Sequence, residues 1–238
     1  VNRSGRHRAE ILDFLFHRRR WREYLGQRIE AGGIDAVGIN CNSLLMRHAG
    51  RVMQEVKERY GLPVICGGPH ATLAPEGFLE QYPADALCIG EGESTIVEYL
   101  DRLEDEAGAG AGSSAGGHAG ETDMSGIRGL WYRRGKETVR NELREFDRDI
   151  DSMPFMDWTL WENLDKYIFL NGGSLPFLGA RGCVYNCSYC CTRAYRETLP
   201  GKYFRQADPG RLIDEIEHNL AEHGARGFRV ARIQDSCF

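Results

Sequence analysis

Short apolar runs alternate with amphipathic stretches through the first hundred residues of the chain. The runs are bounded by glycine, as is typical of buried parallel strands, and they cover residues 35–40, 62–66 and 85–89. Apolar residues recur at helical spacing in the stretches between and after these runs, which predicts helices over residues 44–60, 75–82 and 93–104. The alternation predicts a partial doubly wound parallel α/β sheet, in which ligands bind beyond the carboxyl ends of the strands.

The pattern changes near residue 126 and then begins a second α/β domain. It predicts a strand pair over 129–132 and 137–146, a connector with proline and aromatic residues over 147–161, and strands over 175–180 and 228–233. A helix is predicted over residues 208–223, because Asp208 can cap it and Pro209 suits its first position. The expected buried stripe of this helix consists of Leu212, Ile213, Ile216 and Leu220.

Two segments depart from the alternation. Residues 107–120 are mainly glycine, alanine and serine, which predicts a flexible tether over about 107–125. Residues 9–29 have the spacing of an amphipathic helix with an arginine-rich face, and the acidic residues among the arginines favour a solvated surface over an RNA-binding one. The predicted divisions are therefore a basic helix (1–30), a first sheet (31–106), the tether (107–125), the strand pair and connector (126–172) and a second α/β domain (173–238).

The composition excludes several broad classes of protein. The 238 residues are 42% hydrophobic and 27% charged, as in an ordinary globular protein, and no apolar run reaches the ~18 residues of a membrane-spanning helix. The net charge of −5 argues against a protein that coats nucleic acid, and the first residues lack the apolar core of a secretory signal. We therefore expect a cytoplasmic protein without membrane or nucleic-acid partners, whose eight cysteines are reduced and available to metals.

Three cysteines follow the predicted strand 175–180 in the spacing C-x3-C-x2-C. They are Cys183, Cys187 and Cys190, and Gly182 precedes them. Three thiolates on one loop can converge on a single metal centre, but structural zinc requires four ligands and no second cysteine or histidine pair follows. A 4Fe–4S cluster normally takes four thiolates, so three would leave one iron with an open position for chemistry.

This spacing, with an aromatic residue before the last cysteine, resembles the signature of the radical S-adenosylmethionine (SAM) enzymes. The resemblance covers about residues 151–238 and implies the first strands and helix of a (β/α) barrel. It implies that the three cysteines hold a 4Fe–4S cluster, that Tyr189 packs near the adenine of SAM, and that Asp235 contacts the cofactor. It also implies reductive cleavage of SAM to a 5′-deoxyadenosyl radical, with the electron supplied by a reductase or flavodoxin-type donor.

Glycine-rich turns follow the second and third predicted strands of the first sheet. The sequences Gly67-Gly68-Pro69-His70-Ala71-Thr72 and Gly90-Glu91-Gly92-Glu93 resemble the cobalamin-binding domain fused ahead of many radical SAM enzymes. The resemblance covers about residues 35–103 and implies a flavodoxin-like domain in which Ser43, Gly67, Gly68 and Gly90 face the cobalamin. Only what look like the last three of five family strands are present, so we expect a chain truncated at both ends.

Together the two resemblances imply radical methylation or alkyl transfer to a small molecule or peptide that the sequence does not identify. One alternative is an enzyme similar to the tRNA methylthiotransferases, in which Cys41, Cys66 and Cys88 would hold a second cluster. Another is a catalytically inactive module that binds cobalamin or a cluster, because most of the barrel is missing.

Overall fold

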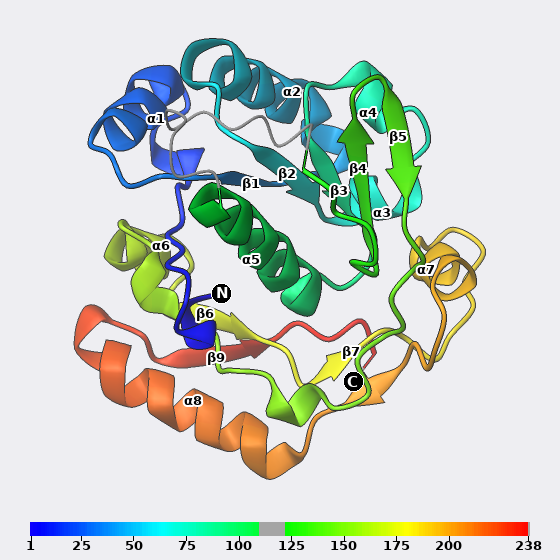
Figure 1. The fold of residues 1–238 in the computed structure, drawn as a ribbon. Helices are drawn as coiled ribbons and strands as arrows, with labels where there is room; N and C mark the ends of the chain where they lie inside the picture. The colour runs from blue at the N-terminus through cyan, green and yellow to red at the C-terminus, as the bar shows by residue number, and fades with distance from the viewer. Residues whose placement is uncertain (110–121, 238) are drawn as a thin grey trace. The chain divides into compact units, whose positions relative to one another are not determined.

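The computed structural model describes residues 1–109 and 122–237 (Figure 1). Contacts within the chain define two compact units. The first unit comprises Val1–Arg8, His17–Glu145 and Thr198–Pro200. The second unit comprises Ala9–Phe16, Phe146–Glu197 and Gly201–Phe238. No helix in the described part of the chain is long and apolar enough to cross a membrane.

A five-stranded sheet of order β1-β2-β3-β4-β5 forms the centre of the first unit (Figure 1). The three predicted parallel strands are confirmed as β1 (Val37–Asn40), β2 (Val64–Gly67) and β3 (Ala86–Cys88). The predicted strand pair is β4 (Leu130–Arg134) and β5 (Glu137–Arg140), and β4 pairs antiparallel with β3. The pair therefore extends the first sheet and makes it mixed, where the sequence predicts a parallel sheet with a separate pair.

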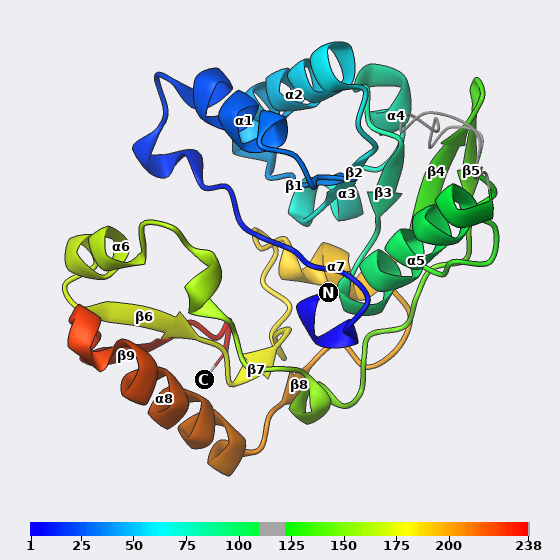
Figure 2. The ribbon, with the colours of Figure 1, turned by 60° about the vertical axis from the view of Figure 1, so that its left-hand side comes forward.

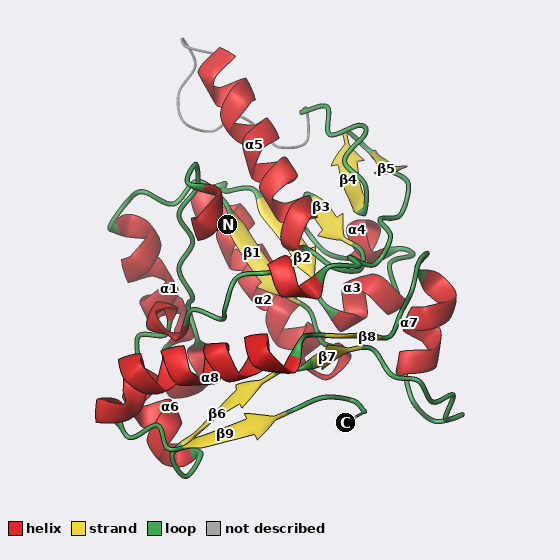
Figure 3. Cartoon of the chain, turned by 90° about the horizontal axis from the view of Figure 1, so that it is seen from below, coloured by secondary structure: helices red, strands yellow, loops and turns green. Residues whose placement is uncertain are grey.

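Helices cover both faces of this sheet, as a doubly wound arrangement requires (Figure 3). On one face, α2 (Met46–Glu55) continues as a π-helical turn, Val56–Tyr60, and Met53 Sδ lies 3.8 Å from the Cys66 thiol. On the other face, Tyr99 of α5 (Glu93–Ala109) packs with Ile65 and Ala86. Neighbouring residues of β2 thus bury their side chains in opposite directions, as the period of a strand dictates. Two short helices follow β2, namely α3 (Pro69–Leu73) and α4 (Phe78–Gln81).

The structure corrects three predicted helix boundaries. The helix predicted over 9–29 begins only at Trp21, as α1 (Trp21–Glu30), because Ile11 instead forms a β-bridge with Trp161 and Phe14–Phe16 form only a short 3-10 helix. The helix predicted over 75–82 shortens to α4, and α3 forms where the sequence predicts a turn. Helix α5 extends to Ala109 and includes the first residues of the predicted tether, and residues 110–121 lie outside the described residues.

The second unit contains two small sheets (Figure 2). Strands β6 (Ser174–Phe177) and β9 (Val230–Ile233) are parallel, and β7 (Ala180–Arg181) is antiparallel to β8 (Arg205–Gln206). The helices are α6 (Leu164–Leu170), α7 (Thr192–Thr198) and α8 (Pro209–His223). The core gathers Trp158, Leu164, Ile168, Leu175, Phe177 and Phe228.

Helix α8 begins as predicted but buries a different stripe. The Asp208 carboxylate accepts hydrogen bonds from the amides of Gly210 and Arg211, which confirms the cap. Leu212 and Ile216 pack against the core, whereas Ile213 is 55% exposed and Leu220 is 49% exposed. The buried residues of the helix are Glu215, Asn219 and His223. The predicted stripe is therefore confirmed for Leu212 and Ile216 and wrong for Ile213 and Leu220. The sequence also missed Glu215, which is buried by binding a polar backbone segment rather than apolar side chains.

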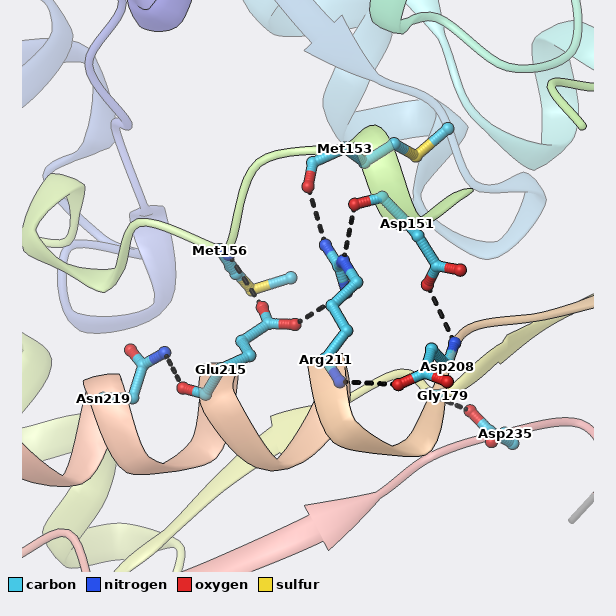
Figure 4. Close-up of polar contacts among 9 residues, drawn as sticks. All are labelled: Asp151, Met153, Met156, Gly179, Asp208, Arg211, Glu215, Asn219 and Asp235. Atoms are coloured by element: carbon cyan, nitrogen blue, oxygen red, sulfur yellow. Dashed lines mark hydrogen bonds and ion pairs between the residues drawn. The ribbon is translucent and has the colours of Figure 1, made fainter. Parts of the chain in front are cut away.

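That backbone segment is the connector before α6 (Figure 4). Glu215 accepts a hydrogen bond of 2.8 Å from the amide of Met156. Arg211 donates to the carbonyl oxygens of Asp151 and Met153 at 2.9 and 2.7 Å, and its guanidinium lies 3.4 Å from the Glu215 carboxylate. The two charged side chains therefore fasten residues 151–156 to the first turns of α8.

Candidate functional site

The cysteine loop of the second unit is closed at its base by strands. The pairs Ala180↔Gln206 and Arg181↔Arg205 of β7 and β8 bring together the ends of the segment 182–204, which contains the cysteine loop (residues 182–191) and α7. Gly182 follows at once with a φ of 84°, and a Cβ at this position would run into the carbonyl of Tyr203. Only glycine combines that backbone conformation with so close an approach, so Gly182 lets the loop start directly against Tyr203.

The three predicted ligands all lie on this loop, in different surroundings. Cys183 is 8% exposed, and its Sγ lies 3.8 Å from the carbonyl of Ser236. Cys187 is exposed and Cys190 is half-buried, and the amide of Cys190 donates to the Cys187 carbonyl at 3.1 Å. The three sulfur atoms do not all lie within 4.8 Å of one another, whereas tetrahedral zinc holds its sulfur ligands ~3.8 Å apart. Three thiols on one loop are the type of ligand that an iron–sulfur cluster takes.

Thr192, at the start of α7, forms a hydrogen bond with the third cysteine of the loop. Its hydroxyl lies 3.3 Å from Cys190 Sγ, and this hydrogen bond is the main reason that the pKa of the Cys190 thiol is lowered. Because the thiolate is the form that binds metal, this hydrogen bond would favour metal binding at Cys190. Neighbouring Cys191 is exposed.

The two residues proposed to contact SAM are not brought together by a direct contact. Tyr189 is 91% exposed on the cysteine loop. Asp235 follows β9, and its carboxylate accepts a hydrogen bond of 2.9 Å from the amide of Gly179. This bond fixes the Asp235 side chain beside the strand end that leads into the cysteine loop. The roles of both residues toward SAM stay predictions.

At the carboxyl edge of the first sheet, Ser43 and His70 join two loops. Ser43 Oγ lies 2.9 Å from His70 Nδ1, which links the loop after β1 to α3 after β2. Leu44 beside Ser43 is 91% exposed, and Leu45 is exposed as well. Exposed apolar side chains next to polar groups suit a large, partly apolar ligand, so this edge fits cobalamin.

The three predicted glycines at this edge also meet protein atoms. A Cβ at Gly68, where φ is 92°, would run into the Asn40 side chain, and one at Gly67 would contact Cys88 Cβ at 3.6 Å. A Cβ at Gly90 would lie 3.0 Å from Leu199, a buried side chain of the first unit from much later in the chain. Close packing between loops therefore accounts for Gly68 and Gly90, and contact of the three glycines with cobalamin stays a prediction.

The remaining cysteines of the first unit do not suit a second cluster. Cys41 and Cys66 are fully buried and Cys88 is nearly so. The pKa of Cys66 is raised by its hydrogen bond with Cys41 and by burial, and burial raises the pKa of Cys88 to about 11. The same hydrogen bond lowers the pKa of Cys41, but Cys66 and Cys88 are held protonated in a packed core and are poor metal ligands. A second cluster would need all three thiols, so this disfavours the methylthiotransferase-like alternative.

One other group of possible metal ligands occurs among the described residues, where His7, Asp101 and Glu104 converge. The guanidinium of Arg6 lies 2.9 Å from Asp101 and 2.8 Å from Glu104 and already compensates their charge. We interpret the group as the anchor of the N-terminal segment on α5.

Several residues of the two sites gave no signal in the sequence. Thr192 and Leu199 reach Cys190 and Gly90 through the path of the chain, and no spacing rule links them to these residues. Leu44 is an exception, because a leucine pair directly after a predicted strand could have been recognised as apolar surface at the ligand edge.

Comparisons with known proteins connect both sites. Residues 2–100 match the family model of the B12 binding domain. An uncharacterized methyltransferase of Pyrococcus horikoshii is 31% identical over 198 residues, which are 81% of this chain and 38% of that protein. The cobalamin-dependent radical SAM methyltransferase TokK of Streptomyces tokunonensis is 30% identical over 197 residues, which are 77% of this chain and 25% of that protein.

A solved structure shows the same fold. The radical SAM methyltransferase TsrM of Kitasatospora setae, with cobalamin and a 4Fe–4S cluster bound, aligns with a TM-score of 0.73 over 98% of this chain and 44% of that chain, at 18% identity. The chain thus spans less than half the length of each of these relatives. The chain is therefore similar in sequence to cobalamin-dependent radical SAM methyltransferases and shares the fold of one, and its residues 2–100 match the B12 binding domain.

Proposed function

We propose that this chain is the cofactor-binding part of a cobalamin-dependent radical SAM enzyme that transfers a methyl or other alkyl group to carbon. The observation that carries the proposal is the cysteine loop, in which three thiols follow Gly182 and one is activated by Thr192, in the same chain as a B12-binding domain. The relatives named above as methyltransferases favour methyl transfer over other radical reactions.

The chain's own residues would bind and orient the groups. Cys183, Cys187 and Cys190 would hold the 4Fe–4S cluster, with Thr192 favouring the thiolate of Cys190. Tyr189 and Asp235 would position SAM, and the edge formed by Ser43, His70 and Leu44 would receive cobalamin. When bound, the cluster and cobalamin would supply the electron that cleaves SAM and the alkyl group that is transferred.

Two partners follow from this chemistry. Each reductive cleavage consumes one electron, so a reductase or flavodoxin-type donor has to deliver it. The substrate would be a small molecule or peptide with an unactivated carbon, and the relatives' names do not define it for this chain. We place the protein in the cytoplasm, where thiols stay reduced.

Anaerobic reconstitution with iron and sulfide, followed by electron paramagnetic resonance of the reduced protein, tests the proposal. We expect a 4Fe–4S signal that shifts when SAM is added, and about four irons per chain. Cys187→Ala should abolish the signal, whereas Cys191→Ala, which removes the exposed thiol beside Cys190, should leave it intact. Full iron content in Cys187→Ala would contradict the assignment.

A second measurement separates an enzyme from a binding module. The chain should take up hydroxocobalamin with a change in its visible spectrum, and the reconstituted, reduced protein should release 5′-deoxyadenosine from SAM. Uptake of cobalamin and cluster without 5′-deoxyadenosine would favour the inactive module.

A further inference from the structure

The backbone of the cysteine loop has little regular structure of its own. No helix or strand is assigned between β7 and α7, which are separated by residues 182–191. Carbonyl groups in such a segment need partners from elsewhere. The carbonyls of Cys183 and Tyr185 find one partner, since Nη2 of Arg196 donates to both, at 2.9 and 2.6 Å.

Arg196 is itself held in place from the other side. Its guanidinium lies over the ring of Tyr203, 5.9 Å from the centroid. The ring centroid of Tyr203 in turn lies 5.2 Å from that of Phe146, and the backbone of Tyr203 lies directly against Gly182. All of these residues belong to the second unit. A planar, always protonated side chain is therefore fixed between a rigid aromatic ring and the first half of the C-x3-C segment.

We infer that Arg196 is a positioning residue for the iron–sulfur cluster. By holding the carbonyls on both sides of Val184, it fixes the path of the chain from Cys183 toward Cys187. Its positive charge also offsets part of the charge of three thiolates, and it favours the more negative, reduced state of the cluster. This inference rests on the proposed function, because it requires that the cysteines hold a cluster.

The test compares two arginines of α7 in the reconstituted chain. Arg193 lies one turn before Arg196 and is exposed, and its side chain pairs with Glu197 at 2.7 Å rather than with the loop. In Arg196→Ala we expect loss of iron to a chelator roughly tenfold faster than in wild type, because outer-shell partners typically contribute that much to metal affinity. We also expect a more negative midpoint potential of the cluster. Arg193→Ala should match wild type in both measurements.

Arg196→Lys separates charge from geometry. It keeps the positive charge but loses the planar guanidinium that donates to both carbonyls. The midpoint potential should therefore return to the wild-type value, whereas iron should still be lost to the chelator faster than in wild type. If circular dichroism shows that Arg196→Ala does not fold, Arg196→Gln takes its place, because it is neutral and can still donate one hydrogen bond.

The outcomes distinguish this inference from the proposed function. A wild-type chain that takes up no cluster overturns both. A wild-type cluster, with the same chelation rate and potential in Arg196→Ala or its Gln replacement as in Arg193→Ala, overturns only the role of Arg196. A slower chelation rate in the Arg196 variant than in wild type overturns it equally.

Discussion

Cys190 and Cys88 carry the same thiol group, and their neighbours move its pKa in opposite directions. The Thr192 hydroxyl stabilises the thiolate of Cys190 and lowers its pKa, whereas burial raises the pKa of Cys88 to about 11. At neutral pH, Cys190 therefore has the larger thiolate fraction, which is the reactive and metal-binding form. The local hydrogen bond, and not the cysteine spacing alone, makes the loop suited to metal.

Thr192→Val tests this hydrogen bond. Valine has nearly the same shape but no hydroxyl, so the Cys190 thiolate loses its donor and the pKa of Cys190 should rise toward its usual range. In the metal-free chain, the pH midpoint for alkylation of Cys190 by iodoacetamide should shift upward, as followed by mass spectrometry. Cys187 in the same sample is the internal control, and an equal shift at both cysteines would contradict a local effect.

Gly182→Ala tests the start of the loop. Alanine would adopt an unfavourable left-handed conformation at about 1–2 kcal/mol, and its Cβ would also run into Tyr203, at a further cost of about 1–3 kcal/mol. Gly135 has a similar φ of 60° but open space around it, so Gly135→Ala should show only the first cost. Urea unfolding measures the loss in the free energy of unfolding for each variant. Equal losses in the two variants would mean that Tyr203 moves aside without strain.

At this scale the sequence predicted that three thiols share one loop, but not what surrounds them. The spacing of Cys183, Cys187 and Cys190 places three thiols on one loop whatever the rest of the fold does. The contacts of Thr192 and Arg196 depend on the direction in which α7 leaves the loop, and those of Gly90 depend on Leu199, more than a hundred residues away. Such contacts arise from tertiary structure and leave no local pattern.

Helix α8 shows how one element can bind a segment that has no regular structure. Arg211 and Glu215, one turn apart, bind three backbone groups of residues 151–156 and pair with each other (Figure 4). Glu215 is nearly buried. A buried charge that loses its partner is much more destabilising than a broken surface pair.

Arg211→Ala should therefore lower the free energy of unfolding by about 2–4 kcal/mol. The matched control is Arg226→Ala, since Arg226 pairs with Asp165 on an exposed surface at 3.2 Å and should contribute less than about 1 kcal/mol. Thermal unfolding of the two variants gives the comparison. Similar losses in both would show that the contacts to residues 151–156 contribute little.

Elements were predictable where their signal is local. Asp208 and Pro209 mark the start of α8, and the glycine-bounded apolar runs mark β1, β2 and β3. The burial of the Glu215 side chain and the pairing of β4 with β3 were not predictable, because each depends on a partner distant in sequence. The same holds for Ile11, whose bridge to Trp161 overrides the helical spacing of its neighbours.

The two units of the whole molecule offer one proposed cofactor site each. Hydroxocobalamin should slow amide exchange in the first unit, at the loops after β1 and β2 near Ser43 and His70, because ligand binding stabilises the folded state of what it contacts. Reconstitution of the cluster should instead protect residues 182–191. Hydrogen exchange with mass spectrometry measures both. Protection of the cysteine loop by cobalamin alone, or none near Ser43, would contradict this assignment.

The segment Thr198–Pro200 gives the first unit an unusual dependence on the order of synthesis. Leu199 is buried against Gly90 within that unit, yet the ribosome adds it more than fifty residues after the last long stretch of the unit, His17–Glu145, is complete. Domains generally fold as they emerge, N-terminal first. In this chain the first unit lacks the side chain that covers Gly90 until the cysteine loop and Leu199 have also been made. Expression of residues 1–145 as a separate polypeptide would therefore give a first unit without Leu199, the side chain that packs against Gly90.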